Sequence, residues 1–538
     1  LLPDFRSFLS AWVVLHTLIA AGFMAALAYR WYEDRGAAAG AAVLAGFNGF
    51  FMARVMFTHC FASQAWLPAA LYFQDRGSPV AMGICLALQW LAGYPTYSCL
   101  TAMACLGLAA TRGRTGMKIF FQGGVVALGL SAVQFIPFLE LLFHSSRRLV
   151  LDPSFAAQFS IPFAQLAREV FLPQWNRWNP GLQGDPAMVY FYIGPIALGL
   201  ALHALARGAP RARRLGIASI IFIFLSLGKY IPGYRFLFFL HFFRSQNNWL
   251  LLASCALALL GAAGIASLRK YSWKWLAVGA VALDLMIFAQ PSKSAWGTPE
   301  FLTDTPALIQ KLSHIPRARI YHEEHLMRTW GQGTLNAEED YLLMKDFLAP
   351  SYGMAFGIGD IANYQTLQLK TAEQYRRRLS EPDAPSSLLN SAGASAVVSL
   401  APQATRVERK HIRALMNPDA KPHIFILEGS GGTLRMTEDR SGYASAVVDV
   451  PHPAMIVFSE ADYPGWRVLL NGREIPRELF DGIFMAARIH AGRHHIVFKF
   501  NPLSFWLGLA LTLGTLYWIL SRFAVKREVG SVGVCSCP

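Results

Sequence analysis

The stretch that decides the fold is KIFFQGGVVALGLSAVQFIPFLELLF, residues 118–143. It is apolar over more than the roughly 20 residues that a helix needs to cross a bilayer. Ten further apolar segments are spread along the chain, and those that begin near residues 58, 79, 95 and 215 are short. The sequence therefore predicts about eleven membrane spans. They are residues 9–29, 37–53, 58–74, 79–93, 95–110, 118–143, 187–206, 215–228, 249–268, 275–290 and 503–520.

The composition agrees with many spans. Of 538 residues, 54% are hydrophobic and 15% are charged, and the mean hydropathy is +0.34. A water-soluble globular protein carries about 25% charged residues, so a single soluble domain is excluded. A polytopic α-helical membrane protein is indicated instead. The chain starts at Leu1 without a Met, so we expect the natural N-terminus to lie upstream.

The net charge of +15 is unevenly distributed. Residues 291–502 hold 23 basic and 23 acidic side chains, so the excess lies entirely in the apolar part. There, 16 of 25 basic residues fall in alternate loops, most densely in 207–214. By the positive-inside rule these loops are cytoplasmic. This arrangement predicts that residues 291–502 lie outside a bacterial cytoplasmic membrane and that the C-terminus returns to the cytoplasm. Basic loops between spans are not a nucleic-acid signature.

Five parts follow from these patterns: a multi-span domain (1–290), an external mixed α/β segment (291–422), an external antiparallel β-sandwich (423–502), a final span (503–520) and a cytoplasmic tail (521–538). We predict a helix at 306–312 capped by Thr305. We predict a hairpin at Asn471-Gly472, because both turn positions favour positive φ. A second hairpin is predicted to join strands 484–489 and 494–500 around Ala491-Gly492.

An ordered set of short motifs resembles the YfhO family of bacterial membrane proteins. The motifs are Phe47-Asn48-Gly49-Phe50, His59, Ala65-Trp66-Leu67-Pro68, Gly93-Tyr94-Pro95-Thr96-Tyr97, Gln134-Phe135-Ile136-Pro137-Phe138-Leu139-Glu140 with Ser146-Arg147, Phe243-Arg244, and Tyr463-Pro464-Gly465-Trp466 with Asn471-Gly472, Ala491-Gly492 and Asn501-Pro502. Four positions depart from the family pattern, namely Tyr94, Thr96, Gln246 and Asn248. The likeness covers nearly the whole chain.

The resemblance implies a GT-C-like architecture and a glycosyltransferase activity. Its donor would be a polyprenyl-phosphate-linked sugar, its acceptor a cell-envelope polymer, and its site the external membrane face. In such enzymes the catalytic carboxylate sits in the first external loop, which here would precede Leu1. The catalytic residue is therefore unknown, and the candidates within the chain are Glu140 and Asp152.

The phosphate of such a donor needs cations, and arginine suits it through bidentate contacts. The candidates are Arg147, Arg148 and Arg244, which could equally anchor the protein to lipid headgroups. Glu140 would pair with Arg244 or line the donor cavity. His59, Trp66 and Gln134 are candidate groove-lining residues, with plain packing as the alternative. Asp284 lies inside a span, and we expect it to make an interhelical polar contact. Asp75 falls in a cytoplasmic loop, where we expect it only to be solvated.

No His, Cys or carboxylate cluster has the spacing of metal ligands, so we expect no metal site and no evident cofactor, although a divalent cation stays open. Two other functions remain in view. A lipid-linked-sugar transporter or flippase would need ionisable groups deep within its spans. A noncatalytic envelope assembly factor would use its spans only to anchor the external part.

Overall fold

The structure, a computed structural model, describes residues 5–147, 151–171, 190–288, 304–332, 338–349, 351–361, 367–381, 383–404, 407–427 and 431–531. The chain divides into two compact units. The helical unit comprises residues 1–136, 149–296 and 507–538, and the β-rich unit comprises 137–148 and 297–506. Two long helices, α8 and α22, contribute residues to both units.

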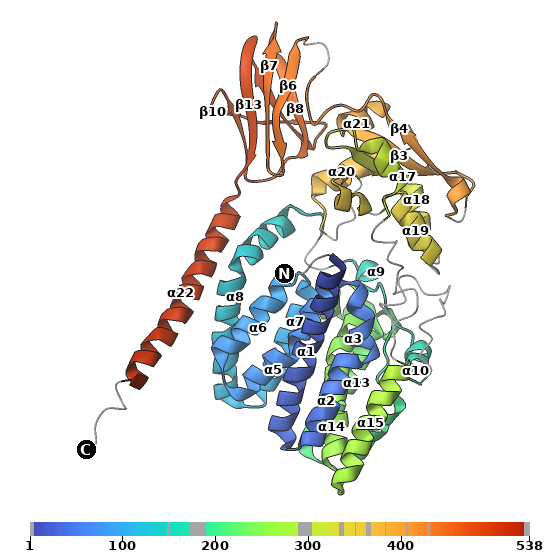
Figure 1. The fold of residues 1–538 in the computed structure, drawn as a ribbon, viewed down its shortest axis with the longest axis vertical. Helices are drawn as coiled ribbons and strands as arrows, with labels where there is room; N and C mark the ends of the chain where they lie inside the picture. The colour runs from blue at the N-terminus through green and yellow to red at the C-terminus, as the bar shows by residue number, and fades with distance from the viewer. Residues whose placement is uncertain are drawn as a thin grey trace. The chain divides into compact units, whose positions relative to one another are not determined.

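Most helices of the helical unit overlap the predicted apolar segments, but segments 37–53 and 58–74 are each divided into two helices (Figure 1). The start of segment 187–206 and the end of segment 275–290 lie outside the described residues. The helices of this unit are α1 (Phe5–Tyr32), α2 (Arg35–Phe47), α3 (Gly49–Ala53), α4 (Thr58–Ala65), α5 (Leu67–Arg76), α6 (Pro79–Leu91), α7 (Pro95–Ala110), α8 (Gly113–His144), α9 (Pro153–Ala156), α10 (Phe163–Phe171), α12 (Pro195–Ala206), α13 (Pro210–Ser226), α14 (Leu250–Ala266), α15 (Tyr271–Phe288) and α22 (Leu503–Ser531). Its 3-10 turns are η1 (Arg54–Met56), η2 (Gly228–Tyr230), η3 (Tyr234–Phe236), η4 (Phe238–Phe242) and η5 (Gln246–Trp249).

Helix α14 is the centre of this unit. It packs against α2, α12 and α13, and nearly all its side chains are buried. A helix that is apolar all round, as α14 is, must be covered on every side. By length and hydropathy, five segments of the described chain are long and apolar enough to cross a membrane: 7–32, 35–53, 113–144, 246–266 and 503–522. The predicted count of about eleven is therefore not confirmed. Helices α6, α7 and α12 are apolar but shorter.

The β-rich unit contains a small mixed sheet and a β-sandwich. The mixed sheet has the order β2-β1-β3-β4. Strand β1 runs parallel to both β2 and β3, whereas β4 runs antiparallel to β3. The elements of this part are α17 (Ala307–Leu312), β1 (Arg319–His322), α18 (Glu324–Gln332), α19 (Glu338–Asp346), η7 (Tyr352–Phe356), β2 (Gly359–Asp360), α20 (Lys370–Leu379), α21 (Ser386–Ser391), β3 (Ala394–Leu400), η8 (Arg409–His411) and β4 (Ile412–Met416). The predicted cap is wrong, because Pro306 rather than Thr305 precedes the first turn of α17.

The sandwich packs two antiparallel sheets, ordered β10-β9-β13-β7-β6 and β11-β12-β8-β5, over one apolar core (Figure 1). Its strands are β5 (Ile424–Ile426), β6 (Thr433–Arg440), β7 (Tyr443–Val450), β8 (Ala454–Ala461), β9 (Trp466–Leu470), β10 (Arg473–Ile475), β11 (Glu478–Phe480), β12 (Phe484–Ile489) and β13 (Gly492–Phe500). The hairpin at Asn471-Gly472 is confirmed, with φ of 51° and 82° at the two turn residues.

The second predicted hairpin is wrong. Strands β12 and β13 belong to different sheets, so the chain crosses the sandwich at Ala491-Gly492 instead of turning back on itself. Strand β12 pairs with β8 and β11, whereas β13 pairs with β7 and β9. Met485 of β12 and Phe498 of β13 enter the same core from opposite sides. The chain crosses from one sheet to the other so that the inner faces of both strands reach the shared core. The residues of a turn do not reveal such a crossing.

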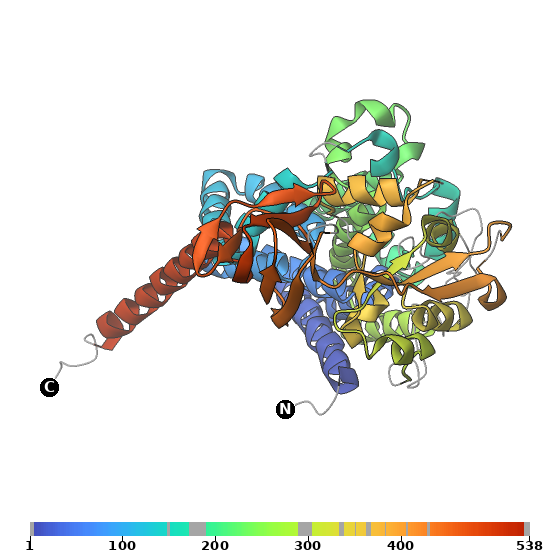
Figure 2. The same ribbon diagram turned by 90° about the horizontal axis from the view of Figure 1, so that it is seen from above.

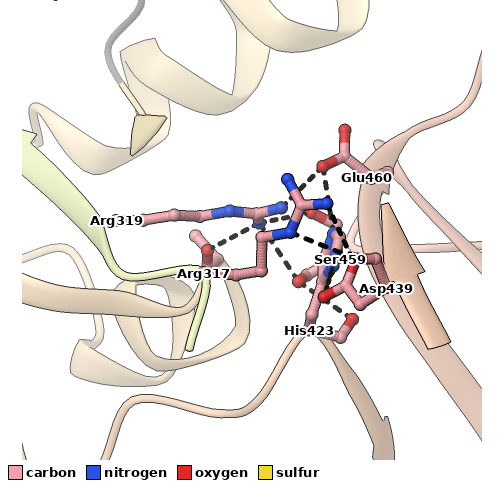
Figure 3. A network of polar contacts seen from close by, with 7 residues as sticks. Arg317, Arg319, His423, Asp439, Ser459 and Glu460 are labelled. Atoms are coloured by element: carbon pink, nitrogen blue, oxygen red, sulfur yellow. Dashed lines mark hydrogen bonds and ion pairs between the residues drawn. The ribbon is translucent and has the colours of Figure 1, made fainter. Parts of the chain in front are cut away.

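A polar network joins the mixed sheet to the sandwich, and we call it the clamp (Figure 3). Arg319 of β1 donates from Nη1 to the Ser459 carbonyl oxygen at 2.6 Å and from Nη2 to Glu460 Oε1 at 2.6 Å. The same Nη1 reaches the Ala392 carbonyl oxygen at 3.1 Å. One guanidinium thereby ties together three segments of the β-rich unit.

The other half of the clamp is centred on His423. Its Nδ1 lies 3.0 Å from Asp439 Oδ2 and its Nε2 lies 3.0 Å from Glu460 Oε1. Arg317 Nε lies 3.3 Å from Asp439 Oδ1 and completes the pairing (Figure 3). The charges of the clamp are thus opposed within hydrogen-bonding reach, which identifies it as a structural joint.

Candidate functional site

The candidate site begins where Asn48 interrupts the second predicted span. Asn48 Oδ1 accepts a hydrogen bond from the Phe51 amide at 3.0 Å and caps α3, while its Nδ2 donates to the Leu44 carbonyl oxygen at 2.7 Å. This break lets the chain turn through η1 and places Arg54 at the end of α3. A capping side chain here therefore positions a cation.

Arg54 is buried, with 1% of its surface exposed. Its Nε donates to the Tyr97 hydroxyl at 3.2 Å, and its Nη1 donates to the Phe50 carbonyl oxygen at 3.3 Å. The guanidinium carbon also lies 3.6 Å from the centre of the Phe50 ring, in a cation–π contact. A cation among apolar helices is costly unless it is held in this way. The sequence analysis gave Arg54 no role, although an arginine within an apolar run was the available signal.

A chain of contacts leads from Tyr97 to Arg244. The rings of Tyr97 and Tyr94 lie edge to face, 4.6 Å apart. The Tyr94 hydroxyl accepts a hydrogen bond from Asn248 Nδ2 at 3.2 Å, and the same Nδ2 donates to the Arg244 carbonyl oxygen at 3.2 Å. Tyr94 and Asn248 are two of the positions that depart from the family pattern. Here they form a direct link, which sequence reasoning missed.

Arg244 itself is half-buried and held through one edge of its guanidinium. Nε donates to Gln158 Oε1 at 2.7 Å, and the guanidinium carbon lies 4.8 Å from the Phe155 ring centre. Within the described residues, the terminal nitrogens Nη1 and Nη2 have no hydrogen-bond or ion-pair partner. The Nε edge of the guanidinium is therefore oriented by a neutral side chain.

Gln246 fixes the backbone beside Arg244. Its Nε2 lies 3.0 Å from the Leu240 carbonyl oxygen and 2.9 Å from that of Phe243, and its Oε1 accepts from Trp249 Nε1 at 3.2 Å. Gln246 is fully buried. Its amide also reaches the Ala156 carbonyl oxygen at 3.1 Å, which ties the turns before α14 to α9. This residue, another departure from the family pattern, serves as a backbone joint.

The three predicted groove-lining residues have different surroundings. His59 is exposed, and its ring centre lies 5.6 Å from that of Tyr94, so it adjoins the candidate site. Trp66 ends α4 and packs against the helical core. Gln134 is partly buried in α8, and its Oε1 has no hydrogen-bond partner in the described part of the chain. Their role in lining a donor groove stays a prediction.

Glu140 belongs to the β-rich unit. Its Oε2 accepts a hydrogen bond from the Ser504 hydroxyl at 2.7 Å and lies 3.5 Å from the Tyr463 hydroxyl. The partner described for Arg244, in contrast, is Gln158. Arg147 is half-buried, and its backbone amide donates to Ser145 Oγ at 3.3 Å. Arg148 lies outside the described residues, so its role as a phosphate ligand stays a prediction.

Asp152 caps α9, the short helix that carries Phe155. Its carboxylate accepts hydrogen bonds from both the amide and the hydroxyl of Ser154. These bonds hold the pKa of Asp152 below its ordinary value. A carboxylate that is already satisfied and easily ionised is a weaker base. Its catalytic role stays a prediction, while its capping role is visible.

Two carboxylates of the helical unit are structural. Asp284 of α15 accepts a hydrogen bond from the Tyr192 hydroxyl at 2.6 Å. The polar contact is present, but Tyr192 precedes α12 and is not helical, so the partner is not on a second helix as predicted. Asp75, which the sequence places in a loop where it would only be solvated, is 3% exposed and pairs with Arg30 at 2.6 Å and Arg112 at 2.5 Å. The solvated interpretation of Asp75 is wrong. In the described chain, no group of three or more His, Cys, Asp or Glu side chains could hold a metal ion.

Comparisons with known proteins give little beyond this. No family model and no curated protein matches the chain, so the YfhO resemblance stays a prediction. The cryo-EM structure of the mycobacterial arabinofuranosyltransferase AftD is similar, with a TM-score of 0.43 and 10% sequence identity. The similarity covers 91% of this chain and 51% of that one, so the chain spans about half of its length. Such an identity transfers neither a substrate nor a residue role.

Proposed function

We propose that the chain is a membrane glycosyltransferase of GT-C type. It would transfer a sugar from a polyprenyl-phosphate donor to a cell-envelope acceptor on the external face of a bacterial cytoplasmic membrane. The observation that supports this best is the state of Arg244. One edge of its guanidinium is held by Gln158, and its two terminal nitrogens face no described protein partner.

The chemistry of the donor fits that state. The phosphate leaving group gains negative charge as the glycosidic bond breaks, and oriented donors stabilise such charge best. A guanidinium offers two parallel hydrogen bonds to a phosphate. Residues 186–283 contain no Asp or Glu. Asp152, which caps the helix that carries Phe155, is hydrogen-bonded to Ser154.

The proposal also covers the acceptor and the catalytic carboxylate. The β-rich unit would lie outside the membrane and select or position the acceptor. We leave the catalytic carboxylate unassigned, because Glu140 is hydrogen-bonded to Ser504 and Asp152 caps α9. A lipid-linked-sugar transporter is less well supported. It would need titratable groups within its spans, and Asp284 is engaged with Tyr192.

The binding step can be tested with the full chain in nanodiscs. The probe is a polyprenyl phosphate, with the matching polyprenol as the uncharged reference. Arg244→Ala should weaken phosphate-lipid binding by roughly tenfold or more, because a charge-assisted hydrogen bond contributes about 1.5–3 kcal/mol. Arg168→Ala, which removes an exposed arginine of α10, is the matched control. Equal binding of both lipids by the unaltered protein would contradict the proposal.

The activity is tested in cells that depend on this protein. Arg244→Ala should lower the sugar content of the envelope polymer, while Arg168→Ala should leave it unchanged. Protein levels must match in the two strains. An unchanged sugar content with Arg244→Ala would remove this arginine from the site. Labelling that places residues 297–506 in the cytoplasm would contradict the proposed side of action.

A further inference from the structure

The segment between α13 and α14 carries an unusual surface, and we call residues 228–243 the aromatic loop (drawn in green in Figure 2). It consists of the 3-10 turns η2, η3 and η4. Phe236 is 64% exposed and Phe238 is 66% exposed. The exposed aromatic side chains of the loop are Tyr230, Phe236, Phe238, Phe239 and Phe242. Apolar patches of this kind mark interaction surfaces.

The rings are exposed although the loop is well anchored. Tyr234, Leu240 and His241 are buried on its inner side. The amide of Leu151 donates to the His241 carbonyl oxygen at 2.9 Å, and Gln246 Nε2 reaches the Leu240 carbonyl oxygen at 3.0 Å. The backbone of the loop is thus fixed from behind. Its outward aromatic face is built into the fold.

Two basic side chains lie next to these rings. Lys229 Nζ lies 5.4 Å from the Tyr230 ring centre, and the Arg235 guanidinium carbon lies 5.0 Å from that of Phe236. In the sequence the nearest acidic residues on either side are Asp185 and Asp284. In the structure Asp152 lies beside His241 of the loop, and its carboxylate is hydrogen-bonded to Ser154. The loop therefore presents apolar rings and positive charge together, which matches the headgroups and upper acyl chains of anionic lipids.

The apolar surface continues along the preceding helix. Helix α13 exposes a row of apolar side chains that ends just before the loop, namely Ile217, Ile220, Ile221 and Phe224. A row of exposed aliphatic residues suits the bilayer interior, and aromatic rings suit its interface. The order along the chain is therefore that of a membrane-facing helix followed by an interfacial segment.

We propose that the aromatic loop is an interfacial docking surface for anionic phospholipids. Its rings insert among the upper acyl chains, and Lys229 and Arg235 bind headgroup phosphates. This inference does not depend on the proposed enzymatic activity, since it concerns the bilayer lipid and not a sugar donor. A second copy of the chain and the isoprenoid chain of a donor are the other occupants that an experiment must separate.

Photocrosslinking in nanodiscs provides the test. The photoreactive residue p-benzoylphenylalanine replaces Phe236 or Phe238 in the full chain, and it replaces Leu415 as the control. Leu415 is 60% exposed on β4 of the β-rich unit. Both loop positions should form phospholipid adducts, and position 415 should not. Adducts to a second protein copy, or lipid adducts that require added polyprenyl phosphate, would overturn the proposal.

The choice of lipid tests the charge. With mixed phosphatidylcholine and phosphatidylglycerol, the adducts should be enriched in phosphatidylglycerol. Lys229→Gln and Arg235→Gln should each lower that enrichment by up to about fivefold, the effect expected of one basic residue near an anionic surface. Arg168→Gln serves as the control. If both loop variants keep the full enrichment, or if no enrichment occurs, the anionic selectivity is contradicted. An unchanged melting temperature shows that each variant is folded.

Discussion

The helical and β-rich units hold their arginines in different ways. In the β-rich unit, Arg319 and Arg317 face the carboxylates of Glu460 and Asp439. In the helical unit, the described side chains that contact the Arg244 guanidinium are the neutral Gln158 and Phe155. A carboxylate cancels the charge of the arginine that it holds, whereas an amide orients the arginine and leaves its charge available.

The difference is local and does not follow from the membrane-like composition of the helical unit. Asp75 is buried in that unit and pairs with Arg30 and Arg112. The helical unit can therefore supply a carboxylate where an arginine has only a structural task. The neutral partner of Arg244 is consistent with a site that must receive an anion. The predictions below test this contrast.

The largest effect is expected when the clamp loses Arg319. Arg319→Ala removes the donor to Glu460 and to the Ser459 carbonyl oxygen. Breaking a buried pair costs about 3–5 kcal/mol, and the partial exposure of Glu460 reduces this to roughly 2–3 kcal/mol. Hydrogen exchange in the full chain should show loss of protection in β1 and β8. Binding of polyprenyl phosphate should not change, and a parallel loss of binding would contradict the division of tasks.

The next largest effect is expected when the neutral partner of Arg244 becomes charged. Gln158→Glu keeps the hydrogen bond to Arg244 Nε and adds a carboxylate beside the guanidinium. Phosphate-lipid affinity should fall by roughly tenfold, about 1.4 kcal/mol, although no arginine has been removed. Gln158→Met keeps the size and the neutral charge, so it should lose less affinity. An affinity that survives Gln158→Glu would show that the neutrality of this partner has no role.

Much of the fold was visible in the sequence because the relevant physics is local. Apolar length predicts helix bounds, and the predicted segment 95–110 is the same as α7. Positive φ at Asn471 and Gly472 follows from the turn itself. The sheet membership of β12 and β13 was not predictable in this way. It depends on the partners β8 and β7, which lie far away in the sequence.

The candidate site was less predictable for the same reason. Arg244 was selected from the sequence, but its orientation depends on Gln158, which lies 86 residues away. The burial of Arg54 depends on Tyr97, 43 residues away. Asp75 was judged from its predicted loop position alone, and its two arginines come from the last turn of α1 and from the turn after α7. Composition and motif order therefore find the charged residues but not their partners.

The clamp should also respond to acid. Burial acts to raise the pKa of Asp439 and of Glu460, but the contact with His423 and the nearby arginines outweigh it, so both pKa values lie below the ordinary range. A carboxylate with a lowered folded-state pKa contributes stability above its unfolded pKa. That contribution is lost as the pH falls through the folded-state value.

Protection of β5 and β8, corrected for intrinsic exchange rates, should therefore hold from neutral pH to roughly pH 5 and then decline. The contribution of Asp481 to stability has the opposite pH dependence. Burial raises the pKa of Asp481, so ionising its carboxyl in the folded state costs stability as the pH rises. Asp439→Asn should make the acid decline shallower. A decline of the same depth in Asp439→Asn would exclude this residue as a contributor.

The smallest effect concerns the contact between α8 and α22 within the helical unit. Thr512 Oγ1 accepts a hydrogen bond from the Val133 amide at 3.1 Å and lies 3.2 Å from the Gly129 carbonyl oxygen. The hydroxyl thus enters the backbone ladder of α8 one turn before Pro137, whose ring already removes one hydrogen bond from that helix.

Thr512→Val keeps the shape and removes the hydroxyl, so it should destabilise the helical unit by about 0.6 kcal/mol, the average for a hydrogen bond between membrane helices. Thr515→Val is the control, because that hydroxyl donates within its own helix to the Leu511 carbonyl oxygen. Unfolding of the full chain in detergent measures both. If the two variants lose the same stability, the Thr512 hydroxyl contributes no specific free energy to the contact between α8 and α22. Polar side chains of the helical unit would then contribute measurably only where they bind a charged group, as Gln158 does.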